Sequence, residues 1–313
     1  MSSQRGTSLR KSKALIAAIT GAVLLGVLAT AGPAAAAGDQ PSPSGTVGTD
    51  IVGGHQASQA YPAMASLQLG HNGDPNWHIC GAYLVSHLYA AVNAHCVTSF
   101  PDGAALPPEL FHLRIGSANR LSGGVVVHVT QILPHADWNW AAGPGPVSDI
   151  ALLRLDTYVQ LQPFEIAPRL HDRSTVRLLG WGVTEPSGEG PLPLDLQELN
   201  TRLVPAEQCA AAGITAGEIC VGNPNGTDGA CYGDSGGPAL QHAGTRRWAA
   251  IGGASRETTP FCGTGPAVYT DATYFRNWMY QVMRTGQVPP RTSSGAVAAT
   301  PAPTRSYHWA ASA

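Results

Sequence analysis

The stretch GDSGGP, which begins at Gly233, contains a serine with glycines close on either side. This setting lets Ser235 lie on a tight turn, and the missing side chains let a substrate backbone come close. The backbone N–H groups of Gly233 and Ser235 can then point at one spot and bind a carbonyl oxygen as it becomes negative. Asp234 stands where a buried carboxylate could hold the turn in place. The stretch therefore indicates a nucleophilic serine with an oxyanion hole.

A serine hydroxyl is a poor nucleophile until a base takes its proton. Histidine suits this role because imidazole titrates near neutral pH, and the chain has 11 histidines. His95 follows a predicted strand and a small residue, and it precedes Cys96. The other histidines lack such a context, and we interpret them as surface or polar-network residues. His95 is therefore the candidate base.

Three further stretches precede the serine in a fixed order: Ile51-Val52-Gly53-Gly54, Asn93-Ala94-His95-Cys96 and Asp149-Ile150-Ala151-Leu152-Leu153. With them, the chain resembles the chymotrypsin/trypsin family of serine endopeptidases from Ile51 to about Gly286, and we expect a secreted bacterial trypsin-like branch. The resemblance implies that Asp149 holds the imidazole of His95 in the tautomer that accepts the proton of Ser235.

The stretch around Ser235 also fits other classes of protein. The pattern G-x-S-x-G also occurs in α/β-hydrolases, including secreted esterases, which need an acid and then a histidine after the serine. Only His242 and His308 follow Ser235, and alternating strands and long helices are absent from the sequence pattern. A non-catalytic relative that binds a partner usually lacks a triad residue, whereas this chain keeps all three. A peptidase is the leading reading, and a secreted binding protein is the alternative.

The resemblance gives Ile51 a role that depends on cleavage of the chain. A free α-ammonium at Ile51 could turn inward and pair with Asp234, which would order the oxyanion hole and the specificity pocket. The residue before it is Asp50, whereas most trypsin relatives are cut after Arg or Lys. The sequence therefore predicts a zymogen whose activating protease is open.

The primary specificity pocket is expected to be lined by seven residues: Gly229, Ala230, Tyr232, Ser255, Arg256, Glu257 and Ala267. Gly229 stands where trypsin-like relatives carry the aspartate that receives a substrate Arg or Lys. A floor without charge leaves a buried cation unpaired, so we expect apolar residues before the cut bond, medium-sized if Glu257 narrows the entrance. Asp228 is the competitor, because a one-residue bulge could turn it into the pocket.

Six cysteines allow 15 pairings. The resemblance selects Cys80–Cys96, Cys209–Cys220 and Cys231–Cys262, the last joining two walls of the pocket. The sequence offers no metal or cofactor motif, since residues 115–125, where the family's calcium loop would lie, contain no acid. A net charge of −2 argues against a nucleic-acid partner. We expect no cofactor, polypeptide substrates, proteinaceous inhibitors as possible partners, and a monomer.

Short apolar runs separated by turns, with 37 glycines, 25 prolines and 12% charged residues, favour strands over helices. With the resemblance, they predict an all-β fold of two packed six-stranded antiparallel β-barrels and a C-terminal α-helix. That helix is expected to be capped by Asp271 and to bury six side chains: Tyr274, Phe275, Trp278, Met279, Val282 and Met283.

The remaining segments are assigned from composition. Residues 1–37 combine a basic start, an apolar stretch and small residues, which is typical of a secretory signal peptide. Residues 38–50 read as a pro-segment, 51–286 as the protease domain, and 287–313, rich in Pro, Ala, Ser and Thr, as a disordered tail. We therefore expect a secreted, extracellular protein with no membrane attachment after the signal is removed.

Overall fold

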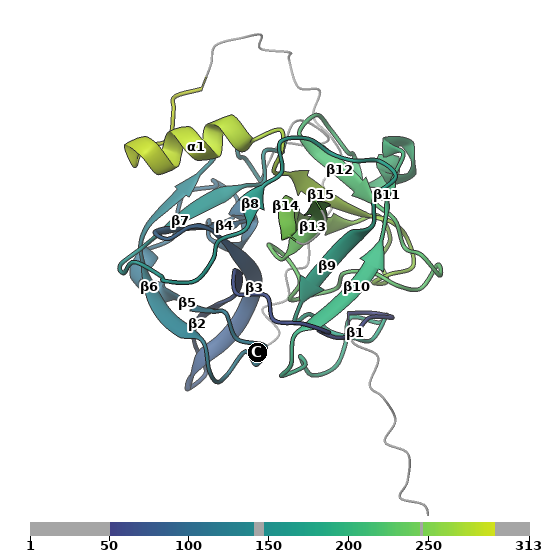
Figure 1. Cartoon of the computed structure of the whole chain (residues 1–313), viewed down its shortest axis with the longest axis horizontal. Coiled ribbons are helices and arrows are strands. Elements are labelled where there is room, and N and C mark those ends of the chain that lie inside the picture. The colour runs from purple at the N-terminus through teal and green to yellow at the C-terminus, as the bar shows by residue number, and fades with distance from the viewer. Residues whose placement is uncertain (1–50, 141–146, 245–246, 292–313) are drawn as a thin grey trace, which may run out of the picture. The chain divides into compact units, whose positions relative to one another are not determined.

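The computed structural model describes residues 51–140, 147–244 and 247–291. The proposed signal peptide and pro-segment and most of the proposed tail lie outside these residues. The first half of the described chain is a closed six-stranded antiparallel barrel in the order β2-β3-β4-β7-β6-β5, drawn in purple to teal in Figure 1. Its strands are β2 (Met64–His71), β3 (Asp74–Ser86), β4 (Tyr89–Val92), β5 (Phe111–Ile115), β6 (Val125–Pro134) and β7 (Ala151–Leu155).

Alternation of side chains explains how a barrel with such short strands obtains a core. In β5, Phe111, Leu113 and Ile115 are buried, and the two residues between them are half-exposed, as the period of two in a strand requires. Strands β4 and β7, which pair with each other, are buried along almost their whole length. These strands lead directly into and out of the segments that carry His95 and Asp149.

The second half differs from the closed six-stranded barrel that we expected. Nine strands form an open sheet in the order β1-β10-β9-β13-β14-β15-β12-β11, with β8 paired to β14. The strands are β1 (His55–Gln56), β8 (Glu165–Ile166), β9 (Val176–Gly180), β10 (Gln197–Thr201), β11 (Leu203–Val204), β12 (Glu218–Val221), β13 (Pro238–Ala243), β14 (Arg247–Glu257) and β15 (Ala267–Asp271). Strands β10 and β11 follow each other along the chain but are not paired. The backbone at Arg202 therefore links β11, at one end of the sheet, to β10, the strand next to β1 at the other end.

One α-helix, α1 (Arg276–Thr285), occurs among the described residues, with three 3-10 segments, η1 (Ala94–Cys96), η2 (Pro108–Leu110) and η3 (Ala206–Ala212). The helix begins later than expected. The Asp271 carboxylate accepts the backbone N–H groups of Thr273 and Tyr274, so it stabilises the turn before the helix, and Phe275 is the N-cap. As a consequence, Tyr274 is 62% exposed and not buried.

The buried face of α1 packs against the first barrel, although the helix follows the second sheet in sequence (Figure 1). Phe275, Trp278, Met279 and Val282 belong to the same buried cluster as the barrel side chains. Helix α1 therefore packs against the half of the protein that holds His95 and Asp149. None of the helices in the described ranges is long and apolar enough to cross a membrane.

The three disulfides are those that the resemblance selected. Cys80–Cys96 joins β3 to η1, Cys209–Cys220 joins η3 to β12, and Cys231–Cys262 joins the segments on either side of β13 and β14. All six cysteines are therefore paired, and the first bond restrains the residue next to His95.

A buried ion pair fixes the segment before β2 against the second sheet. The Glu198 carboxylate, on β10, lies 2.7 Å from the Arg177 guanidinium on β9. It also accepts the hydroxyls of Ser58 and Tyr61, each at 2.7 Å. The side chain of Glu198 is 1% exposed, so its charge depends on these partners.

We predict that Arg177→Ala lowers the free energy of unfolding by about 3–5 kcal/mol, because it leaves the buried Glu198 charge without a cation. The matched control is Arg247→Ala, which breaks the Arg247–Glu165 pair. Its atoms are 2.8 Å apart, but the two side chains are 71% and 56% exposed. That variant should lose about 1 kcal/mol or less. Denaturant unfolding of both variants measures the difference, and equal losses would contradict the prediction.

Candidate active site

The carboxylate of Asp149 is the centre of a buried hydrogen-bond network. Asp149 lies just before β7 and is 2% exposed. Its Oδ2 accepts from His95 Nδ1 at 2.7 Å, and its Oδ1 accepts the backbone N–H of His95 at 2.9 Å. Two hydrogen bonds from one residue fix both the place and the ring orientation of His95, which is the arrangement that a general base requires.

Two further donors complete the network, and sequence reasoning gave neither of them this role. Asn93 Nδ2 donates to Asp149 Oδ2 at 3.0 Å, and the Ser255 hydroxyl donates to the same oxygen at 2.7 Å. Ser255 was expected only as a pocket wall, yet its side chain joins β14 to the carboxylate. No sequence pattern signals this contact, because the two residues are 106 positions apart.

The charge of Asp149 is stabilised in spite of its burial. Burial alone raises the pKa of a carboxyl. The charge and hydrogen bond of His95, together with the donors on Asn93 and on the His95 backbone, outweigh burial and lower the pKa of Asp149 to about 2. Asp149 is therefore ionised at any pH near neutrality and can stabilise a positive charge on the imidazole.

The turn that carries Ser235 packs against the first barrel. The backbone N–H of Gly81 donates to the Ser235 carbonyl at 2.8 Å. Gly236 has a φ of 75°, and a Cβ there would lie 2.3 Å from the Gly81 carbonyl oxygen and 3.4 Å from the Asn93 nitrogen. Glycine at 236 is thus required both by the turn and by the close approach to the segment that holds His95.

Asp234 points into the interior on the other side of this turn. Its carboxylate accepts the backbone N–H groups of Gly182 at 2.8 Å and Cys231 at 2.9 Å. A Cβ on Gly180 or Gly182 would collide with it, at 1.8 and 2.4 Å. The Gly180-Trp181-Gly182 segment therefore leaves the space that the Asp234 carboxylate occupies. These two glycines are a signal in the sequence that we did not use for the prediction. Burial raises the pKa of Asp234 to about 7, against the two N–H donors, which lower it.

Ile51 begins the described chain and is 1% exposed. The carbonyl of the next residue, Val52, accepts the N–H of Gly229 at 2.9 Å. Ile51 shares a buried cluster with Ala230, Ala254 and Tyr269. The segment predicted to act in activation thus lies against the segment that precedes Ser235.

The structure gives the residues predicted to form the specificity pocket different surroundings. Gly229, Ala230 and Ala267 offer no polar side chain, and Tyr232 is 58% exposed. Arg256 is turned toward η3 and β12, where its guanidinium contacts Glu218 at 2.5 and 2.9 Å. Glu257 carries a buried carboxyl oxygen.

The competitor Asp228 does not lie free beside these residues. It is 5% exposed, and it accepts hydrogen bonds from the amide of Asn225 and from the Thr227 hydroxyl, the latter at 3.1 Å. A Cβ on Gly53 would lie 2.3 Å from its Oδ1. Asp228 therefore supports the turn after Ile51.

A buried histidine, which we predicted to be a surface or polar-network residue, supports the backbone at Gly233. His78 is 2% exposed, and its Nε2 lies 2.9 Å from the Gly233 carbonyl. Its Nδ1 lies 2.7 Å from the hydroxyl of Ser66, which in turn accepts from Gln68. This pattern suits a neutral ring that donates from Nε2, and burial lowers the pKa of His78 to about 4.

We predict that His78 makes the protein acid-sensitive. The folded protein holds a neutral ring down to about pH 4, whereas the unfolded chain binds the proton near pH 6.5. The stabilisation is therefore present above pH 6.5 and is lost as pH falls toward 4, by on the order of 3 kcal/mol. His78→Gln keeps a donor toward Gly233 without a titrating ring. The free energy of unfolding of this variant should fall less between pH 7 and 4 than that of the unaltered protein. If the two proteins lose the same free energy over this range, His78 is not the group responsible.

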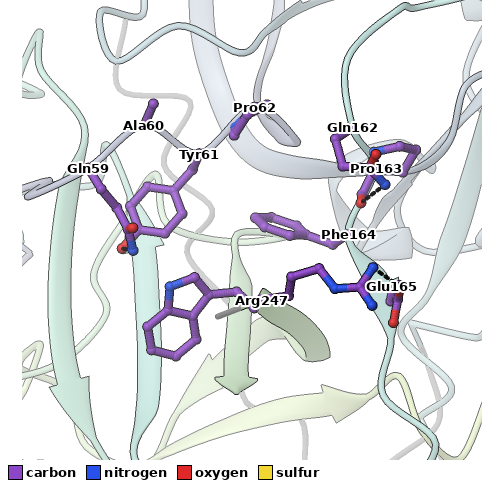
Figure 2. A pocket seen from close by; sticks show the side chains of 10 residues that line it. Gln59, Ala60, Tyr61, Pro62, Gln162, Pro163, Phe164, Glu165 and Arg247 are labelled. Atoms are coloured by element: carbon purple, nitrogen blue, oxygen red, sulfur yellow. Dashed lines mark hydrogen bonds and ion pairs between the residues drawn. The ribbon is translucent and has the colours of Figure 1, made fainter. Parts of the chain in front are cut away.

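A separate pocket is shown in Figure 2. It is lined by residues 59–62, residues 162–165, Arg247 and Trp248. The Arg247–Glu165 ion pair closes one side of it. None of the residues predicted to be catalytic or to bind substrate lines this pocket, so it is separate from the Asp149 network.

The barrel, the open second sheet and the C-terminal helix form a chymotrypsin-like fold. The chain matches the family model described as Trypsin over residues 51–279. It is 31% identical to a vitellin-degrading protease of Bombyx mori, over 64% of this chain and 75% of that protein. It is 30% identical to trypsin epsilon of Drosophila erecta, over 75% of this chain and 88% of that protein.

Among solved structures, mouse neuropsin, a serine protease, is similar with a TM-score of 0.60 and 26% identity, over 74% of this chain and 98% of that chain. The chain therefore belongs to the trypsin family and is a serine-type endopeptidase, whose substrates are polypeptides. The bacterial branch that we expected is not supported by these insect and mouse relatives.

Proposed function

We propose that the protein is a secreted endopeptidase that cuts peptide bonds through an acyl-enzyme on Ser235, with His95 as base and Asp149 as the group that orients it. The observation that carries the proposal is the 2.7 Å contact between His95 Nδ1 and the buried Asp149 carboxylate. It is supported by the packing of the Ser235 turn against the segment of Asn93, two residues before His95.

In the first half of the reaction, His95 takes the proton of the Ser235 hydroxyl as the oxygen attacks the substrate carbonyl carbon. The N–H groups of Gly233 and Ser235 bind the oxygen as it becomes negative. His95 then gives its proton to the leaving amine. Water repeats the sequence on the acyl-enzyme, which releases the second product and restores Ser235.

Each supporting contact has a task in this scheme. The positive charge that forms on His95 is stabilised by Asp149, whose pKa of about 2 keeps it ionised. Ser255 and Asn93 both donate hydrogen bonds to that carboxylate and so keep it in place while His95 moves the proton. His78 holds the Gly233 carbonyl and thereby restrains the peptide next to the oxyanion hole.

We predict that Ser235→Ala and His95→Ala each lower kcat by about 10³-fold or more, with little effect on folding. Asp149→Asn should lower kcat by roughly 10⁴-fold, because the amide favours the wrong imidazole tautomer. Turnover of a peptide substrate and labelling by an organophosphonate measure these effects. A folded Ser235→Ala protein with full peptidase activity would end the proposal.

Activation follows from the environment of Asp234. In the described residues its buried carboxylate has two N–H donors and no cation. Cleavage before Ile51 creates an α-ammonium on a residue that is already buried. Pairing of that ammonium with Asp234 would satisfy the carboxylate and fix the Ser235 turn, so the uncut chain is a zymogen.

We predict that the uncut protein is nearly inactive and that cleavage before Ile51 produces activity that falls reversibly at alkaline pH. The new amine has a reference pKa of about 7.7–8.0, and its pairing with Asp234 raises that value. The ion pair is therefore complete at neutral pH and is lost as pH rises through the raised pKa. N-terminal sequencing with activity measurements tests this, and full activity with a mature N-terminus elsewhere is the contrary result.

The remaining assignments complete the proposal. The protein is made as a secreted precursor with a signal peptide at 1–37, a pro-segment at 38–50, a protease domain at 51–286 and a tail at 287–313. It acts as a monomer, and its possible partners are proteinaceous inhibitors. Membership of the secreted bacterial trypsin-like branch stays a prediction without support from the relatives. The non-catalytic binding protein is not favoured, because His95, Asp149 and Ser235 are all present and His95 is held for catalysis.

A further inference from the structure

Glu257 is the last residue of β14, and its backbone pairs with Ala267 on β15. Its carboxyl oxygen Oε2 is buried and has no hydrogen-bond partner among the described residues. Buried polar atoms are nearly always hydrogen-bonded, so an exception calls for an explanation. An unpaired carboxyl inside a protein is unfavourable unless something reaches it in the working state.

No cation in the surrounding described residues is available to this carboxyl. The neighbouring Arg256 is occupied by Glu218 and by the carbonyls of Ala212 and Gly213, at 2.9 and 3.1 Å. The titratable groups that do interact with Glu257 are Asp234 and Tyr269. Burial first and Asp234 second raise the pKa of Glu257 to about 8, and no positive group among the described residues lowers it.

The residues expected to form the floor and rear of the pocket cannot supply a competing charge. Gly229 has no side chain, and a Cβ there would lie 3.1 Å from the Cα of Gly263. Ala230 and Ala267 are buried and apolar. Asp228, the other acid considered, accepts from Asn225 and Thr227 beneath Gly53. Glu257 is thus the acid among these wall residues whose carboxyl has an unused acceptor.

We propose that Glu257 is the specificity-determining residue of the primary pocket and that its carboxylate receives the guanidinium or ammonium of an Arg or Lys before the cut bond. The inference rests on the proposed function and replaces the apolar preference expected from Gly229 and Ala230. A basic side chain supplies the charge and the donors that Oε2 lacks, and a guanidinium can bind a carboxylate through two parallel N–H groups. The negative charge would thus come from the side wall of the pocket, whereas trypsin-like relatives carry it at the position of Gly229.

The first test measures binding without turnover, in the secreted protein carrying Ser235→Ala and already cleaved before Ile51. Benzamidinium is the cationic probe, and benzamide is its neutral analogue. We expect benzamidinium to bind far more tightly than benzamide, and Glu257→Gln to weaken benzamidinium binding by about 100-fold. Asp228→Asn is the matched control, because it removes the rival carboxylate and should leave the affinity unchanged. Loss of affinity in Asp228→Asn and not in Glu257→Gln would overturn the proposal.

The second test compares substrates that differ only before the cut bond, with lysine or its uncharged analogue norleucine. We expect kcat/KM to favour lysine over norleucine by about 100-fold. This ratio should approach one in Glu257→Gln and in Glu257→Gly. Two variants are used so that the test still works if one of them fails to fold. A preference for norleucine in the unaltered protein, or a ratio that both variants leave intact, contradicts the proposal.

The two tests separate this proposal from the proposed function. If organophosphonate does not label Ser235 but benzamidinium binding still depends on Glu257, the catalytic assignment fails and the cation site stands. If labelling and turnover are normal but neither cation affinity nor the substrate ratio responds to Glu257, the catalytic assignment stands and the cation site fails.

Discussion

The buried carboxylate of Asp149 is the interaction on which the arrangement of the two halves depends. A charge that is 2% exposed must be satisfied by donors, and its donors come from both halves. Asn93 and His95 belong to the first barrel, and Ser255 belongs to β14 of the second sheet. The network is therefore complete only when the two halves have docked. Docking also brings the Ser235 turn against the first barrel, beside Gly81 and Asn93. The contact that satisfies the Asp149 charge therefore also places this turn next to the segment that carries His95.

The other two buried acids of the site contrast with Asp149. Its pKa is lowered to about 2, whereas burial raises the pKa of Asp234 to about 7 and that of Glu257 to about 8. The difference lies in the partners, because Asp149 has a histidine beside it and the other two have no cation in the described residues. Strongly perturbed acids are characteristic of functional sites. We propose that each of these two acids receives a cation later, Asp234 from the new N-terminus and Glu257 from the substrate side chain.

The sequence predicts what depends on short stretches and on residue type. The GDSGGP turn is predictable because Gly236 has a positive φ and lies against Gly81, and the barrel follows from the alternation of apolar residues. Contacts between distant positions leave no such pattern. Ser255 reaches Asp149 across 106 positions, and His78 reaches Gly233 across 155. The open second sheet and the late start of α1 were missed because pairing and capping depend on the docked chain.

The neighbours Arg256 and Glu257 show why adjacency in sequence is a poor guide to pairing. Two opposite charges side by side suggest an ion pair, but successive side chains of a strand point to opposite faces. Arg256 is directed toward Glu218 on β12, a strand that pairs with β15. Glu257 is left with its carboxyl in the interior beside Asp234 and Tyr269. Because Arg256 is paired with Glu218, it is not available to Glu257, and for this reason we propose that the cation for Glu257 comes from the substrate.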